Sequence, residues 1–201
     1  LQAGICPAGR VTRVEEQYRN LDTRIISGFD FSARYFVNSD YGNFNFIVNI
    51  SKLEKFRQKA GNDFIELIDA QEKGIIPEEL AITGFSDLIE KDGSPKIQAN
   101  FKFLWNRGSW GLGLFGRHIG EFYETRNKLS DGRLWKVKAY NTINTFIDYN
   151  FKISGSQSNL RFGINNIADE RAPLASDIFG YYIDKHDNLG RSYYINFIHR
   201  Y

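Results

Sequence analysis

The sequence predicts an all-β fold, an antiparallel segment of a transmembrane β-barrel with about seven strands. Three observations predict it. Apolar and polar residues alternate with period two over much of the chain, short and long connections alternate strictly, and some alternating segments exceed the about 5–6 residues usual in globular strands. Outer-membrane barrels combine these properties, with strands of roughly 9–11 residues that cross the bilayer at a tilt, short periplasmic turns and long extracellular loops.

The alternation defines seven candidate strands. Six lie at 23–37, 44–51, 96–106, 136–153, 160–164 and 193–201, and the fourth in chain order starts at 110–114. The third is the most regular, with Phe101 and Phe103 on one face and Asn100 and Lys102 on the other. Aromatic residues cluster near the strand ends, as in the girdles that membrane barrels place at the lipid–water interface. These aromatics are Tyr35, Phe44, Trp105, Trp110, Phe151 and Tyr201.

The connections between these segments are of two kinds. Residues 38–43, 106–109 and 154–158 are short and rich in turn formers, whereas 55–95, 127–135 and 169–191 are long. If the last strand ends on the periplasmic side, every short link is periplasmic and every long link is extracellular. The longest loop, 55–95, is expected to contain short helices, one capped by Asn62 and a second beginning at Pro77.

Composition excludes several classes of protein. The 201 residues include 26 Lys+Arg and 24 Asp+Glu, and the net charge of +2 is too even to indicate a nucleic-acid partner. No apolar run approaches the roughly 18–20 residues of a transmembrane helix. The single Cys6 cannot form an internal disulfide.

The absence of Met and an odd strand count, in a class of barrels that closes with even numbers of strands, predict that the sequence is the C-terminal part of a longer chain.

Little in the sequence indicates catalysis. Gly111, Gly113 and Gly116 spell the dinucleotide fingerprint G-x-G-x-x-G, but more strand follows where that motif needs a helix. The three histidines, His118, His186 and His199, lack metal-ligand spacing. We therefore expect no enzyme activity, no catalytic residue, no cofactor and no metal.

Two sets of residues are candidates for ligand contact. Polar side chains on the inward faces would line the lumen, where they either hydrate the wall or contact a plug or a solute. They are Asp30, Arg34, Asn100, Lys102, Asn144, Asp148 and Asn150. Aromatic residues in the last long loop would meet a ligand arriving from outside, or pack on neighbouring loops. They are Phe179, Tyr181 and Tyr182.

Motifs near the C-terminus resemble those of TonB-dependent receptors. The stretch RFGINNIADERAP at 161–173 resembles their penultimate-strand signature, in which Gly-hydrophobic-Asn-Asn-hydrophobic-x-Asp precedes a Pro-containing loop. The stretch DNLGRSYY at 187–194 resembles the D-x-x-G-R-x-Y/F entry to their last strand. The aromatic strand 195–201 then resembles the terminal strand read by the barrel assembly machinery, and SGFDF at 27–31 resembles the start of a barrel strand.

This resemblance implies a barrel of about 22 strands filled by an N-terminal plug domain. Such receptors lie in the outer membrane of Gram-negative bacteria and import scarce nutrients such as ferric siderophores, cobalamin or glycans. The TonB complex drives import by pulling on a segment ahead of the plug. Residues 1–201 show neither a plug nor a TonB-contacting segment, so they are expected to form the C-terminal part of the barrel, about a third of its wall.

Two other classes of function stay open from sequence alone. A soluble β-sandwich or lipocalin-like module could bind a small molecule with the same alternating strands. A simple porin, or an outer-membrane enzyme with a catalytic Ser or His, would also use a barrel of this kind.

Overall fold

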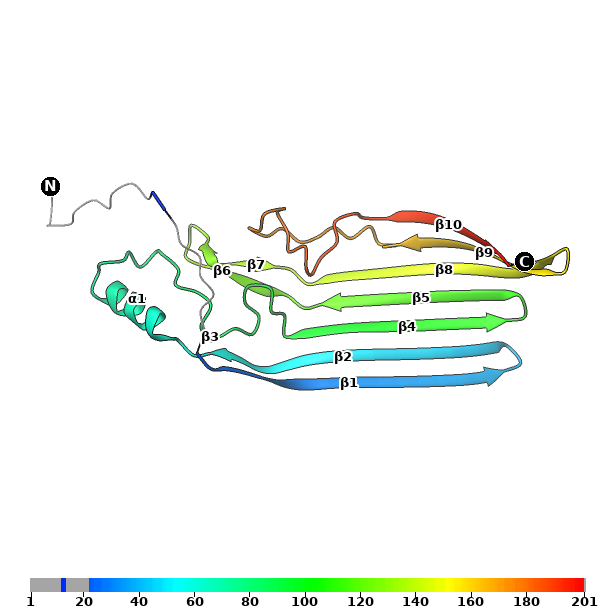
Figure 1. Ribbon diagram of the computed structural model, residues 1–201, viewed down its shortest axis with the longest axis horizontal. Helices are drawn as coiled ribbons and strands as arrows, with labels where there is room; N and C mark the ends of the chain where they lie inside the picture. The colour runs from blue at the N-terminus through cyan, green and yellow to red at the C-terminus, as the bar shows by residue number, and fades with distance from the viewer. Residues whose placement is uncertain (1–11, 14–21, 201) are drawn as a thin grey trace.

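In the computed structural model, which describes residues 12–13 and 22–200, most of the chain forms one antiparallel sheet. Seven long strands, here called the wall, lie side by side in the described part (Figure 1). In order across the sheet they are β1 (Arg24–Ser39), β2 (Gly42–Gln58), β4 (Ile97–Arg107), β5 (Trp110–Ile119), β8 (Tyr140–Ile153), β9 (Ser156–Asn165) and β10 (Ser192–His199). Predictions about Cys6, most of residues 1–22 and Tyr201 fall outside the described residues.

The short and long connections lie at opposite ends of the wall, as predicted (Figure 1). At the turn end, the strands are joined by two-residue turns: β1 to β2 at residues 40–41, β4 to β5 at 108–109 and β8 to β9 at 154–155. Two-residue links are the commonest connections of β-hairpins. At the loop end, residues 59–96, 120–139 and 166–191 make the long connections.

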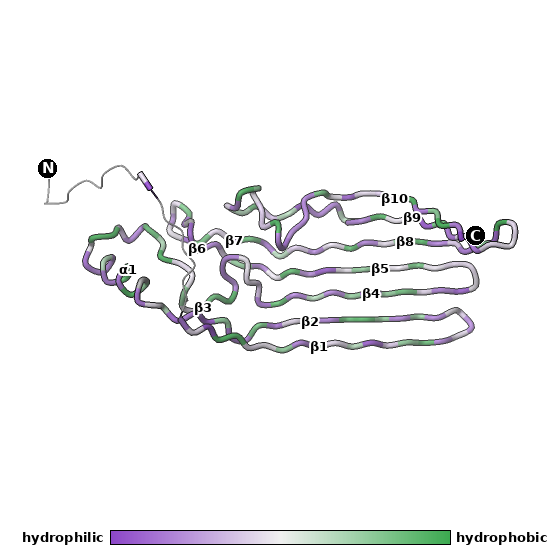
Figure 2. The backbone as a smooth tube through the Cα atoms, in the orientation of Figure 1, coloured by the Kyte–Doolittle hydropathy of each residue, from purple (hydrophilic) through white to green (hydrophobic). Residues whose placement is uncertain are grey.

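The wall has an apolar face and a polar face. Because register is fixed by antiparallel pairing, side chains of like character form rows across the strands. One apolar row runs from Tyr35 through Phe46 and Phe103 to Leu114, and the rings of Phe46 and Phe103 lie 4.9 Å apart. Figure 2 shows hydrophobic and hydrophilic residues interspersed along the wall strands.

The apolar face has no second layer against it in the described part of the chain. Phe31 is 58% exposed and Ile195 is 74% exposed, although both point to this face. A β-sandwich would bury these side chains against another sheet. The described core lies instead at the loop end, where Ile119, Phe122 and Val137 are fully buried.

Glycines in β5 give room to large neighbours. A Cβ on Gly116 would overlap the ring of Phe101, and one on Gly113 would overlap the ring of Phe146. The third member of the G-x-G-x-x-G pattern, Gly111, lies under the carboxylate of Asp148. Since β5 runs on as a strand to Ile119, these residues are packing positions of a sheet and not a nucleotide fingerprint.

Four details differ from the sequence prediction. Strand β2 continues to Gln58, so the first long loop starts later than residue 55. The strand predicted over 136–153 is broken at residues 138–139, and its first part belongs to a separate hairpin of β6 (Phe122–Lys128) and β7 (Leu134–Val137). The break allows Val137 and Tyr140, an odd number of residues apart, both to be buried.

The other two corrections concern the loop 55–95, which contains helix α1 (Asn62–Glu72) and the short strand β3 (Ser86–Asp87). Gly61, not Asn62, is the N-cap of α1, because the Gly61 carbonyl accepts the first helical N–H groups. No second helix forms at Pro77. Instead the Gln71 amide donates to the carbonyls of Pro77 and Leu80, which holds a turn there.

We predict that Gly116→Val destabilises the wall by about 1–3 kcal/mol, because the new side chain needs the space of the Phe101 ring. Gly61→Val is a matched control, since no atom lies within 4 Å of a Cβ built there and its φ of −72° suits any residue. Heat-modifiable electrophoretic mobility of the full chain measures wall stability. Equal midpoints for the two variants would contradict the packing role of Gly116.

Candidate functional site

Two of the predicted lumen residues of the first strands, Asp30 and Asn100, make side-chain hydrogen bonds to a neighbouring strand on the polar face. Ser51 Oγ donates to Asp30 Oδ1 at 2.6 Å. One row further, Asn49 Nδ2 donates to Asn100 Oδ1 at 2.8 Å. Arg34 lies on the same face, paired in register with Ile47 and exposed. Asp30 and Asn100 are therefore held by neighbouring strands, whereas the Arg34 side chain extends into open space.

A second polar group lies near the turn end of β8 and β9. Arg161 forms an ion pair with Asp148 at 2.6 Å, and its guanidinium carbon lies 3.7 Å from the ring centroid of Phe146. Asn159 donates to Asn150 Oδ1 at 2.9 Å. The predicted residues Asp148 and Asn150 thus each bond to their register partner on β9, and Arg161, which sequence reasoning missed, ties Asp148 to that strand.

The polar face is hollowed at the loop end by a cavity of about 270 Å³. Strands β5, β8 and β9 form its floor, and residues 187–192 form one side. Of the predicted lumen residues, Asn144 lines this cavity. Lys102 lies beside it, with its amine 5.7 Å from the centroid of the cavity residue Phe115.

Arg117 is the charged residue of β5 in this cavity, and it was not among the predicted lumen residues. Its partners in register are Asn100 on β4 and Thr142 on β8. Extending the alternation of Gly111 and Gly113 through β5 places it on the polar face, but the faces of this strand were assigned from sequence only at its start, up to Leu114. The seven predicted lumen residues therefore share one face without meeting at one point.

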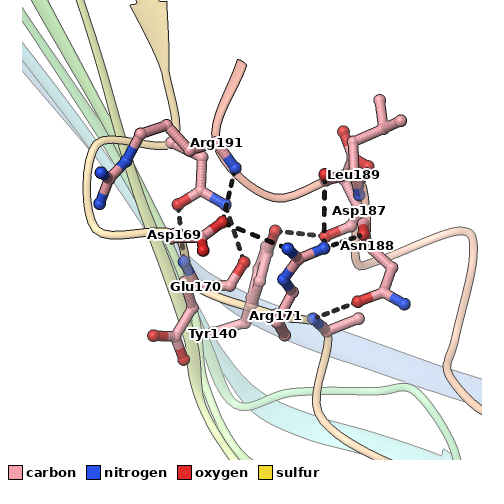
Figure 3. Close-up of polar contacts among 10 residues, drawn as sticks. Tyr140, Asp169, Glu170, Arg171, Asp187, Asn188, Leu189 and Arg191 are labelled. Atoms are coloured by element: carbon pink, nitrogen blue, oxygen red, sulfur yellow. Dashed lines mark hydrogen bonds and ion pairs between the residues drawn. The ribbon is translucent and has the colours of Figure 1, made fainter.

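The side of the cavity formed by residues 187–192 is fixed by contacts with the start of the same β9–β10 loop (Figure 3). Asp169 Oδ1 accepts a hydrogen bond from the Arg191 N–H at 2.7 Å and lies 3.5 Å from the Arg171 guanidinium. These interactions, with the Arg191 N–H the largest cause, hold the pKa of Asp169 below its ordinary value. Arg171 also donates to the carbonyl of Asn188, 3.2 Å away. Residues of the two C-terminal sequence motifs, 161–173 and 187–194, thus hold the start and the end of the β9–β10 loop together.

The predicted loop aromatics have different surroundings. Phe179 is 63% exposed, and Tyr181 is half-buried. Tyr182 packs edge-on against Phe122, with ring centroids 5.0 Å apart. Burial, aided by the nearby carboxylates of Glu124 and Asp92, raises the pKa of Tyr182 to about 12. Tyr182 is therefore part of the packed loops, and Phe179 is the predicted aromatic most open to solvent.

His186 lies in a small core at the loop end. Its ring is 4% exposed, stacks on Phe122 at 6.1 Å and meets Tyr140 edge-on at 5.2 Å. Neither ring nitrogen has a hydrogen-bond partner. Burial, with smaller effects from Arg117 and Lys185, lowers the pKa of His186 to about 4, so the ring is neutral at pH 7.

Neither metal chemistry nor a helical membrane span is indicated by the described residues. In the described ranges, no three His, Cys, Asp or Glu side chains come together as a metal site. No helix there is both long enough and apolar enough to traverse a bilayer.

Comparison with known proteins identifies the family. The family model for the TonB dependent receptor-like β-barrel matches residues 2–167. Since this range is most of the chain, the protein belongs to that family, which consists of receptors and transporters and not of enzymes. Membership implies an outer-membrane location. A search of curated proteins finds none that matches. The motif residues after 167 and strand β10 lie beyond the matched range.

We predict that acid loosens the loop around His186. Its pKa is about 4 when packed and 6.5 when exposed, so protonation favours the open loop and stability is lost as pH falls from 6.5 towards 4. Hydrogen exchange of residues 182–191, corrected for intrinsic rates, should show on the order of tenfold more opening at pH 5 than at pH 7. His186→Phe should remove this difference while keeping the stack on Phe122. The same pH dependence in that variant would assign the effect to another group.

Proposed function

We propose that this protein is a receptor of the outer membrane of a Gram-negative bacterium that imports a scarce nutrient, with ferric siderophores, cobalamin and glycans as the candidate classes. The single observation that carries the proposal is the two-faced wall. Its apolar face has no protein layer against it among the described residues, and its polar face carries side-chain hydrogen bonds between neighbouring strands. Lipid outside and a polar lumen inside would satisfy both faces.

The loop end is proposed to be extracellular and the turn end periplasmic, since barrels of this class place their long loops outside. In this orientation the cavity beside Arg117 opens near the outer mouth of the lumen. Asp30, Arg34, Asn100, Lys102, Asn144, Asp148 and Asn150 are proposed to face the lumen, and Phe179, Tyr181 and Tyr182 to lie among the outer loops.

Two further partners would supply the energy for import and assemble the barrel in the membrane. Import would be driven by the TonB complex acting on a plug region, while residues 1–201 supply the wall and loops. Strand β10, which carries Tyr193, Ile195 and Phe197 on one face, is proposed to be read by the barrel assembly machinery.

We predict that Phe101→Lys blocks assembly of the full chain into the outer membrane of a Gram-negative host, whereas Asn100→Lys does not. Phe101 is on the apolar face, where a charge near the bilayer midplane costs about 2–4 kcal/mol. Asn100 is on the polar face, and its substitution removes one exposed hydrogen bond. The heat-modifiable, membrane-associated fraction measures assembly.

Phe101→Leu separates the charge from the loss of the ring over Gly116. This variant should assemble, although less stably than the parent. If Phe101→Lys and Asn100→Lys assemble equally well, the apolar face does not meet lipid and the receptor function fails.

A further inference from the structure

The cavity on the polar face contains a cation with no counter-ion. Arg117 is exposed and has no hydrogen bond or ion pair with any described residue. Arg161 on the same face differs, because Asp148 neutralises it at 2.6 Å. Lys102 adds a second charge across the ring of Phe115 and also has no ion pair among the described residues.

Several other polar groups of the cavity can donate hydrogen bonds. Asn144 Oδ1 already accepts the Asn166 N–H at 2.7 Å, which leaves the Asn144 NH₂ group for a ligand. Ser192 Oγ accepts from Asn165 Nδ2 at 3.2 Å, so its own hydroxyl proton is free to point elsewhere. The hydroxyl of Thr142 lines the same cavity. A ligand group entering here meets N–H and O–H donors from three strands.

The one acid that lines the cavity, Asp187, is already engaged. Its Oδ1 accepts the Leu189 N–H at 2.9 Å, and its backbone carbonyl accepts the hydroxyl proton of Tyr140 at 2.6 Å (Figure 3). The Asp187 carboxylate therefore holds the turn at 187–189 and forms no ion pair with Arg117. Unpaired positive charge and free donors thus remain in a cavity whose side is fixed by the loop.

We propose that this cavity binds an oxyanion group, a carboxylate or a phosphate, of the imported ligand, with Arg117 as its main contact and Lys102 as a second charge. The planar guanidinium presents paired N–H groups that match two oxygens of such an anion. This inference rests on the proposed receptor function and narrows its substrate class to ligands that carry an anionic group.

The test is calorimetric titration of the folded full chain in detergent micelles with citrate, inorganic phosphate and neutral maltotriose as probes. We expect citrate or phosphate to bind, and the stronger of the two identifies the oxyanion. Arg117→Gln should weaken that binding at least tenfold, since hydrogen bonds to charged groups are the strong ones. Arg117→Lys, which keeps the charge but loses the paired N–H groups, should have an intermediate affinity.

Arg107→Gln, at the turn end of β4, is the matched control and should leave anion binding unchanged. Heat-modifiable mobility shows that each variant is folded. An assembled chain that binds neither anion, or whose Arg117→Gln variant binds as well as the parent, overturns this inference and leaves the receptor function intact. Maltotriose binding that is independent of Arg117, without anion binding, overturns it in the same way. Failure of the parent chain to assemble in the outer membrane would instead count against the receptor function.

Discussion

The structure depends on one constraint, that backbone N–H and C=O groups in a bilayer must be satisfied without water. Antiparallel pairing of the wall strands meets it, from β1 next to β2 through to β9 next to β10. The same pairing makes successive side chains point to opposite faces. Each strand must therefore supply an apolar residue for lipid and a polar residue for the lumen in turn. The period-two pattern and the rows of rings and amides across the wall both follow from this constraint.

Close packing within the wall adds a second requirement, because neighbouring side chains must fit beside one another on a surface that has no core behind it in the described part of the chain. Small residues meet it at particular points. Gly116 lies under Phe101, Gly113 under Phe146 and Gly163 under Tyr194. At the loop end the requirement is different. There the chain forms a small core around Phe122 and Tyr140. The buried ring of His186 fills part of this core without making a hydrogen bond.

Sequence reasoning predicts the wall well because lipid and lumen impose a pattern on every residue. The seven strands and their three tight turns followed from alternation and turn residues, as around Gly108 and Gly155. The structure of the loops could not be predicted in this way, because residues that contact each other there lie far apart in the sequence. Nothing near His186 indicates that it will stack on Phe122, and the break at 138–139 depends on the burial of Tyr140 by the loop at 187. Arg117 was missed for a simpler reason: glycines weaken the hydrophobic signal of β5, so its faces were assigned only at the start of the strand, up to Leu114.

The central claim is that the two faces of the wall meet lipid and water respectively. Spin labels on single cysteines at each position from 98 to 105, in a Cys6→Ser background of the full chain in lipid bilayers, test it most directly. Accessibility to lipid-soluble oxygen should peak at 99, 101, 103 and 105, and accessibility to a water-soluble nickel reagent at 98, 100, 102 and 104. Accessibilities without this alternation, or with the opposite phase, would contradict the account.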